Sequence, residues 1–155
     1  MVRILAIDPG SEESAYVIWD TIAQKLEQKG KLSNEQILEL ISIVYYNKVV
    51  IEMIACYGMP VGQEVFLTVE WIGRFEQLVI DINKSNDLII KVFRKEVKLH
   101  FCNSMKAKDA NIRQALIDRF GKPGTKKSQG KLYGVSADIW SALALAVYYA
   151  DMKML

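Results

Sequence analysis

The stretch Arg3-Ile4-Leu5-Ala6-Ile7-Asp8-Pro9-Gly10-Ser11 decides the fold of this chain. Apart from Arg3, residues 2–7 form an apolar run of strand length, rich in branched side chains, which is typical of a central strand covered on both faces. The run ends in Asp8, and Pro9-Gly10 then turns the chain away without a side chain that would block the carboxylate. We therefore predict a central strand with one acid where the core meets solvent, although a capping role in an ordinary turn would also explain Asp8.

A second apolar run repeats this design. Lys48-Val49-Val50-Ile51-Glu52 is again a short apolar segment that ends in a single acid. If it lies parallel to the first strand, Asp8 and Glu52 emerge at the same edge of the sheet, where open α/β sheets bind their ligands. The two acids therefore predict a site at that edge.

The rest of the chain fits an α/β fold in which a five-stranded mixed sheet is flanked by helices, and we predict a single domain over residues 1–155. Ser33 and Gln36 have the spacing of a capping box, which starts the first helix. Residues 121–131 have the composition of a flexible basic loop. The remaining expected elements are strands over residues 14–20, 25–32 and 88–93, and helices over residues 34–46, 63–83, 94–101, 106–120 and 135–153.

Apolar side chains cover most of the circumference of the expected helix over residues 63–83, among them Phe66, Val69, Phe75 and Ile80. A helix that is apolar nearly all round is buried on more than one side. One side would pack on the sheet, and the other predicts a contact between two subunits.

The composition is that of a globular protein, with 51% apolar and 25% charged residues. No apolar run reaches the length of a membrane span, and we expect no secretion signal. Cys56 and Cys102 form no disulfide or zinc pattern, and His100 does not complete a metal site with them. We expect a protein of a reducing cytoplasm.

Positive charge is concentrated in one segment, although the formal net charge of the chain is only +2. Residues 91–131 contain twelve Lys and Arg side chains against three acids, whereas the rest of the chain is acidic. Such a split indicates a surface for a polyanion such as nucleic acid, with a merely solvated face as the alternative.

A third acid, Asp138, is expected in the first turn of the last helix, with Ser141 one turn later. A lone acid at this position is often a favourable partner of the helix dipole. Here it is the only acid in its turn, and the apolar remainder of the helix would lie against the sheet. Asp138 is therefore the third candidate for the site formed by Asp8 and Glu52.

These three acids, together with the order hairpin, helix, strand, helix and final helix, resemble the retroviral-integrase-like RNase H superfamily. Within it the chain is similar to RuvC-type Holliday-junction resolvases, in the compact form found in phages. The resemblance covers nearly the whole chain and rests on residues 4–11, 50–52, 106–112 and 136–144.

The resemblance implies a Mg²⁺-dependent endodeoxyribonuclease that acts as a homodimer and nicks two opposed strands of a four-way junction. Mn²⁺ would substitute for Mg²⁺, and flaps and replication forks are further expected substrates. Asp8, Glu52 and Asp138 are implied as catalytic metal ligands, and Lys108 as a catalytic lysine that meets the scissile phosphate. The side chains expected to contact DNA are Lys98, Lys106, Lys108, Lys126, Lys127 and Tyr57. A phage-encoded protein of this kind would act in the cytoplasm of its bacterial host.

The chain departs from the cellular members of this family at two positions. Ser141 stands where they have a fourth acid, so it is kept as a weaker candidate ligand, and we expect one tightly and one weakly bound metal. Ala55 stands where they have an aromatic wedge, and Tyr57 follows two residues later. We therefore expect weaker selectivity for junctions.

Two alternatives share the fold: a branched-DNA-binding protein with weak or no cleavage, and a RuvX (YqgF-like) nuclease that processes RNA. The opening of the latter group usually reads Asp-Phe-Gly, whereas this chain has Asp8-Pro9-Gly10. An ATP-binding member of the actin and sugar-kinase superfamily would need two such domains, for which the chain is too short. A pure interaction protein would leave the two strand-end acids unexplained.

Overall fold

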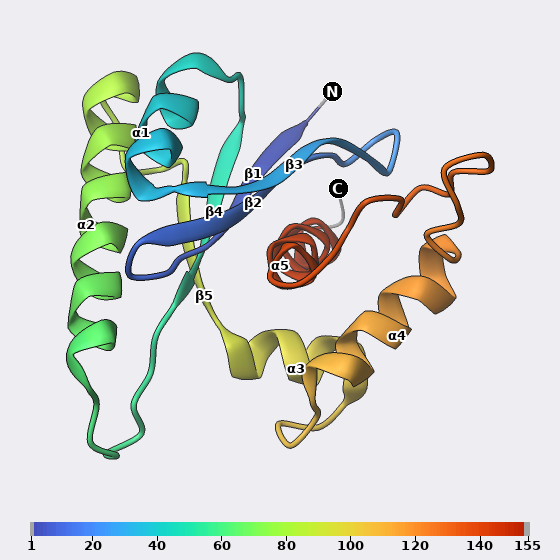
Figure 1. The fold of residues 1–155 in the computed structure, drawn as a ribbon. Helices are drawn as coiled ribbons and strands as arrows, with labels where there is room; N and C mark the ends of the chain where they lie inside the picture. Colours follow the sequence, from blue (N-terminus) through green and yellow to red (C-terminus); the bar gives the residue numbers. More distant parts are fainter. Residues whose placement is uncertain (1, 154–155) are drawn as a thin grey trace.

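The computed structural model describes residues 2–153, and its centre is a five-stranded mixed sheet in the order β3-β2-β1-β4-β5 (Figure 1). The strands are β1 (Arg3–Asp8), β2 (Glu13–Asp20), β3 (Lys25–Ser33), β4 (Lys48–Met53) and β5 (Ile89–Phe93), and the helices are α1 (Asn34–Ile43), α2 (Gln63–Asn83), α3 (Arg94–Cys102), α4 (Asp109–Phe120) and α5 (Ile139–Met152). This arrangement confirms the predicted α/β fold with its mixed sheet.

The opening stretch forms the central strand, as predicted. β1 pairs antiparallel with β2 and parallel with β4, and its residues Ile4 to Ile7 have no exposed surface. Ile7 lies opposite Ile51, so that the next residues, Asp8 and Glu52, leave the core at the same edge of the sheet. The register of β1 and β4 therefore brings the two strand-end acids together.

Helices cover both faces of the sheet (Figure 1). α1 and α2 lie on one face, where Ile37, Ile72 and Phe75 pack on the Leu5 and Ile7 side of β1. α5 lies on the other face and packs on the Ile4 and Ala6 side, with α3 and α4 outside it. Because successive side chains of a strand point to opposite faces, β1 supplies both halves of the core.

Within one chain, the burial of α2 is confined to one side of the helix. Its buried residues, Thr68, Ile72, Phe75 and Val79, lie on one face. On the outer side Phe66 is 66% and Val69 is 39% exposed. The outer apolar side chains are therefore not covered by residues 2–153, and a second chain would be needed to cover them.

Three helices are shorter than the apolar pattern predicts. α1 ends at Ile43 rather than Tyr46, because Val44 is already extended and leads into β4. α4 begins at Asp109 rather than Lys106, because the Asn111 side chain accepts a hydrogen bond from the Lys108 N–H and fixes the start there. α5 begins at Ile139 rather than Val135, because the backbone at residues 134 and 137 is left-handed.

The basic loop over residues 121–131, which its composition predicts to be flexible, contains a hydrogen-bonded turn. Gly124 pairs with Gln129 in a β-bridge, and the Gly130 N–H donates to the Pro123 carbonyl at 2.8 Å. Gly124 has a φ of +79°, and a Cβ on it would lie 2.3 Å from the Ser128 carbonyl oxygen. Only glycine fits this position, so the turn is built into the sequence.

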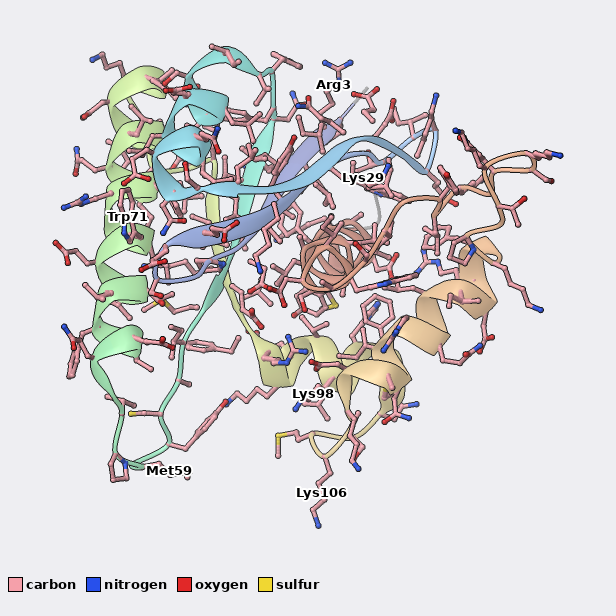
Figure 2. All side chains as sticks on the ribbon, in the orientation of Figure 1. Arg3, Lys29, Met59, Trp71, Lys98 and Lys106 are labelled. Carbon is pink, nitrogen blue, oxygen red and sulfur yellow. The ribbon has the colours of Figure 1, made fainter. Side chains whose placement is uncertain are left out.

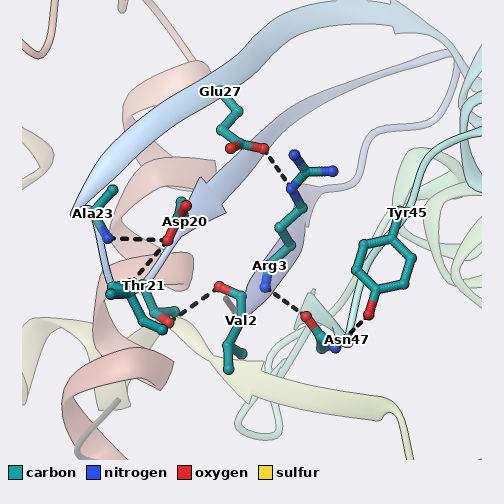
Figure 3. A network of polar contacts seen from close by, with 9 residues as sticks. Val2, Arg3, Asp20, Thr21, Ala23, Glu27, Tyr45 and Asn47 are labelled. Carbon is teal, nitrogen blue, oxygen red and sulfur yellow. Dashed lines mark hydrogen bonds and ion pairs between the residues drawn. The ribbon is translucent and has the colours of Figure 1, made fainter.

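A polar network closes the amino end of β1 (Figure 3). The Arg3 N–H donates to Asn47 Oδ1 at 2.7 Å, and the Arg3 side chain pairs with Glu27 at 2.6 Å. Asp20, at the end of β2, accepts hydrogen bonds from the N–H groups of residues 22 and 23 at 2.9 and 3.0 Å. The side chains of Arg3 and Asp20 therefore each have a partner at this end of the sheet.

None of the helices within residues 2–153 is both long and apolar enough to cross a membrane.

Candidate functional site

Asp8 and Glu52 lie side by side at the carboxyl ends of the parallel strands β1 and β4. The pKa of Asp8 is raised from 3.8 to about 9, mainly by burial and then by the neighbouring Glu52 carboxyl and the charge of Asp138, while the charge of Arg94 lowers it. No N–H group among residues 2–153 donates to the Asp8 carboxyl. In the metal-free protein Asp8 therefore carries a proton at neutral pH, because its burial and the neighbouring acids outweigh the opposing charge of Arg94.

A cavity of about 250 Å³ opens beside Glu52, between the start of α3, the start of α4 and the start of α5. Its polar lining consists of Glu52, Arg94, Asp109, Arg113, Asp138 and Ser141. Apolar side chains such as Ile112, Trp140 and Leu145 form the rest of its wall. Two of the three predicted acids and the candidate ligand Ser141 therefore share one cavity.

Asp138 lies next to this cavity but is held by a basic side chain. It is the residue before α5 and not, as predicted, a member of the first helical turn. Lys31 of β3 donates from Nζ to Asp138 Oδ2 at 2.8 Å, and this contact raises the pKa of Lys31. Within residues 2–153 no three His, Cys, Asp or Glu side chains are close enough to hold one metal ion. Asp138 therefore does not complete a three-carboxylate site in this arrangement.

Arg94, the first residue of α3, joins two acids across the cavity. Its Nη1 donates to Glu52 Oε1 at 3.2 Å, and its Nη2 donates to Asp109 Oδ1. Arg94, Asp109 and Lys31 are not among the site residues that the sequence predicts. A signal for Arg94 was present, because it follows β5 directly, and β5 runs parallel to β4 and ends at the same edge of the sheet.

The structure separates the basic side chains that the sequence analysis grouped together. Lys98 on α3 and Lys106 in the α3–α4 turn lie at one end of α4 (Figure 2). Lys126 and Lys127 lie in the turn beyond its other end, which is about 18 Å away for a helix of this length. Lys108 is the exposed residue before α4 and is not part of the cavity lining, whereas its neighbour Asp109 is.

Tyr57 lies on the loop between β4 and α2, close to Glu52. It is 67% exposed, and the Lys95 ammonium lies 5.6 Å from the centre of its ring. A second cavity of about 240 Å³ is lined by Tyr57, Phe93, Arg94 and Glu52, among others. Met59, at the tip of the same loop (Figure 2), is also exposed.

No protein-family model matches the chain, and no curated protein matches it by sequence. Solved structures do match it over nearly its whole length. RuvC of T. thermophilus in complex with a Holliday junction substrate superimposes with a TM-score of 0.68 at 14% identity, over 99% of this chain and 97% of that one. A second Thermus thermophilus RuvC structure gives the same TM-score at 15% identity, over 98% of this chain and 97% of that one. The chain therefore has the RNase H-like α/β fold of a RuvC-type resolvase.

Proposed function

We propose that this chain is a Mg²⁺-dependent, structure-selective endodeoxyribonuclease that nicks branched DNA such as four-way junctions, and that residues 1–155 form one nuclease domain. The observation that carries the proposal is the pair Asp8 and Glu52. The two carboxyls leave a buried sheet side by side, next to an open cavity, in a fold shared with a protein that was solved on a Holliday junction. An acid pair without an N–H donor on Asp8 costs stability and is explained by a bound cation.

The residues fit a divalent cation. Mg²⁺ takes oxygen ligands and is usually held by one or two carboxylates together with waters and substrate phosphates. Asp8 and Glu52 would supply these two carboxylates, with Mn²⁺ as a substitute ion, and Asp138 and Ser141 are the further candidates on the other side of the cavity. When bound, the metal would supply charge stabilisation at the phosphorus during hydrolysis. The proton on Asp8 has to leave when the cation binds.

The basic segment supports the DNA-binding part of the proposal. Three of its twelve cations are paired within the described chain, since Lys91, Arg94 and Arg119 contact Glu76, Glu52 and Asp151. Within residues 2–153 the other nine have no ion pair: Lys95, Lys98, Lys106, Lys108, Arg113, Lys122, Lys126, Lys127 and Lys131. Together with Tyr57 they would contact phosphates and an unstacked base around the cavity.

Two features favour a homodimer built on α2. The exposed apolar side chain of Phe66 lies opposite the buried face and that of Val69 lies beside it, and a two-fold dimer would present two sites to two opposed strands. Sedimentation of the unmodified protein should show a dimer at micromolar concentration, and Val69→Glu should give monomers.

A cleavage assay tests the proposal. Wild-type protein should nick labelled four-way junctions in Mg²⁺ or Mn²⁺, and Asp8→Asn and Glu52→Gln should abolish nicking while junction binding survives. Asp87→Asn is the matched control, because Asp87 precedes β5 at the opposite edge of the sheet. This variant should nick junctions at the wild-type rate. Cleavage at the wild-type rate by Asp8→Asn and Glu52→Gln would show that the acid pair is not the active site.

The second candidate is a branched-DNA-binding protein that cleaves weakly or not at all. It is favoured by the ion pairs that hold Glu52 and Asp138 and by the neutral Ser141 in the cavity. Tight junction binding without nicking in either metal would establish it. Including structured RNA in the same assay separates both candidates from a RuvX-like RNA nuclease.

A further inference from the structure

Arg94 is placed to control the charge of the acid pair. It begins α3 where β5 ends, and its guanidinium reaches back to Glu52 on the neighbouring strand β4. Its side chain is one-third exposed, whereas the Glu52 side chain is only 15% exposed. The ion pair therefore lies at the mouth of the site, between the buried carboxyls and the cavity.

Asp109 gives the same guanidinium a second partner. It is the first residue of α4, its side chain is 74% exposed, and it contacts Nη2 of Arg94 while Glu52 contacts Nη1. The two acids come from different elements and meet at one cation, which is held in a fork geometry that only Arg provides. Arg94 can thus lose Glu52 and remain paired with Asp109.

We propose that Arg94 is a built-in counter-ion of Glu52 that competes with the divalent metal, and that Asp109 holds its guanidinium once the metal has taken Glu52. Arg94 is thereby a positioning residue that acts through Glu52. The inference rests on the proposed function in one respect: a divalent cation binds at Asp8 and Glu52. A Glu52 oxygen that accepts a hydrogen bond from Arg94 offers less charge to a cation, so the metal has to displace the guanidinium.

Metal binding in the absence of DNA tests this directly. Mn²⁺ affinity of the purified full-length protein can be measured by electron paramagnetic resonance of the free ion. Arg94→Gln and Arg94→Met should each bind Mn²⁺ on the order of tenfold more tightly than wild type, because the competing charge is gone. Arg94→Lys keeps the charge and should bind within about twofold of wild type.

Arg113→Gln is the matched control. Arg113 lines the same cavity as Arg94, and among residues 2–153 it forms no ion pair with an acid. Its removal takes away the same charge from the same wall, and it should change Mn²⁺ affinity by less than about threefold. An equal gain in Arg113→Gln and Arg94→Gln would show a general charge effect and overturn the inference.

A double-mutant cycle tests the role of Asp109. Asp109→Asn alone should weaken Mn²⁺ binding about threefold, because the guanidinium then rests entirely on Glu52. In the Arg94→Gln background the same substitution should change nothing. A loss that persists in that background would mean that Asp109 binds the metal itself, and would overturn the proposed role.

The outcomes separate this inference from the proposed function. If wild type and Asp8→Asn bind Mn²⁺ equally, no ion occupies the acid pair and the proposed function fails. If wild type binds through Asp8 but both neutral Arg94 variants bind no more tightly, only the counter-ion role is overturned. Thermal melting of each variant in the absence of metal confirms that the protein measured is folded.

Discussion

The two ends of the central strand carry similar residues in opposite situations. At the amino end, Arg3 is paired with Glu27, and Asp20 accepts two backbone hydrogen bonds. At the carboxyl end, Asp8 faces another acid, has no N–H donor among the described residues, and has its pKa raised to about 9. A buried acid with donors stabilises the fold, whereas an acid placed against a second acid costs stability. The difference identifies the carboxyl end as the candidate site.

The largest expected contrast is between Asp8→Asn and Asp20→Ala. Asp8→Asn should reduce junction cleavage about a thousandfold or more, since it removes a metal ligand, and should raise the free energy of unfolding at pH 8 by on the order of 1–3 kcal/mol. Asp20→Ala should leave cleavage unchanged and lower stability by about 1–2 kcal/mol, because two N–H groups lose their acceptor. Urea unfolding and the cleavage assay give both values, and stability changes of the same sign would break the comparison.

The pH dependence of stability sharpens the comparison. The pKa of Asp8 is raised from 3.8 to about 9 in the folded protein, so its contribution to stability is present below pH 4 and is lost as pH rises toward 9. This residue alone should lower the free energy of unfolding by up to about 1.4 kcal/mol per pH unit across that window in EDTA.

Thermal melts of wild type and Asp8→Asn from pH 5 to pH 9 measure this dependence. The difference between the two proteins should grow with pH in EDTA and shrink when Mg²⁺ is added, because a bound cation favours the ionised carboxylate. Parallel melting curves for the two proteins across this range would contradict the raised pKa.

A smaller effect on cleavage is expected from adding an acid beside the cavity at the carboxyl end of the central strand. Ser141 lines the cavity together with Glu52 and Asp138, and a carboxylate is a better Mg²⁺ ligand than a hydroxyl. Ser141→Asp should lower the Mg²⁺ concentration for half-maximal nicking by roughly threefold to tenfold. Ser136→Asp, one turn before α5 and outside the cavity lining, is the control and should leave that midpoint unchanged.

The smallest effects are expected from one ion pair at each end of the sheet. Lys31 and Asp138 are both more than 40% exposed, whereas Arg3 and Glu27 are each below 30%. Lys31→Gln should therefore cost at most about 0.5 kcal/mol of stability and Arg3→Gln about 1 kcal/mol. Only Lys31→Gln should alter the Mg²⁺ dependence of nicking, because only it frees an acid beside the cavity. A change in that dependence caused by Arg3→Gln would mean that the two ends are coupled.

Much of the fold follows from local sequence patterns. The apolar runs that end in Asp8 and Glu52 predict two parallel strands, and the capping box of Ser33 and Gln36 is present at the start of α1. The starts of α4 and α5 were predicted three and four residues too early, because the sequence pattern does not show where the backbone first becomes helical. The left-handed backbone of Ala137 delays the start of α5, and the apolar pattern gives no sign of this conformation.

The sequence by itself determined the central strand, the strand order implied by its hairpin, and the meeting of Asp8 with Glu52, since strand length, polarity and direction are local properties. Only the tertiary structure decided the partners of the acids. Arg94 reaches Glu52 over 42 positions and Lys31 reaches Asp138 over 107, and no spacing rule connects residues so far apart. The strand pattern therefore locates the acids, whereas the packing of α3, α4 and α5 around the sheet edge decides which cation each acid holds.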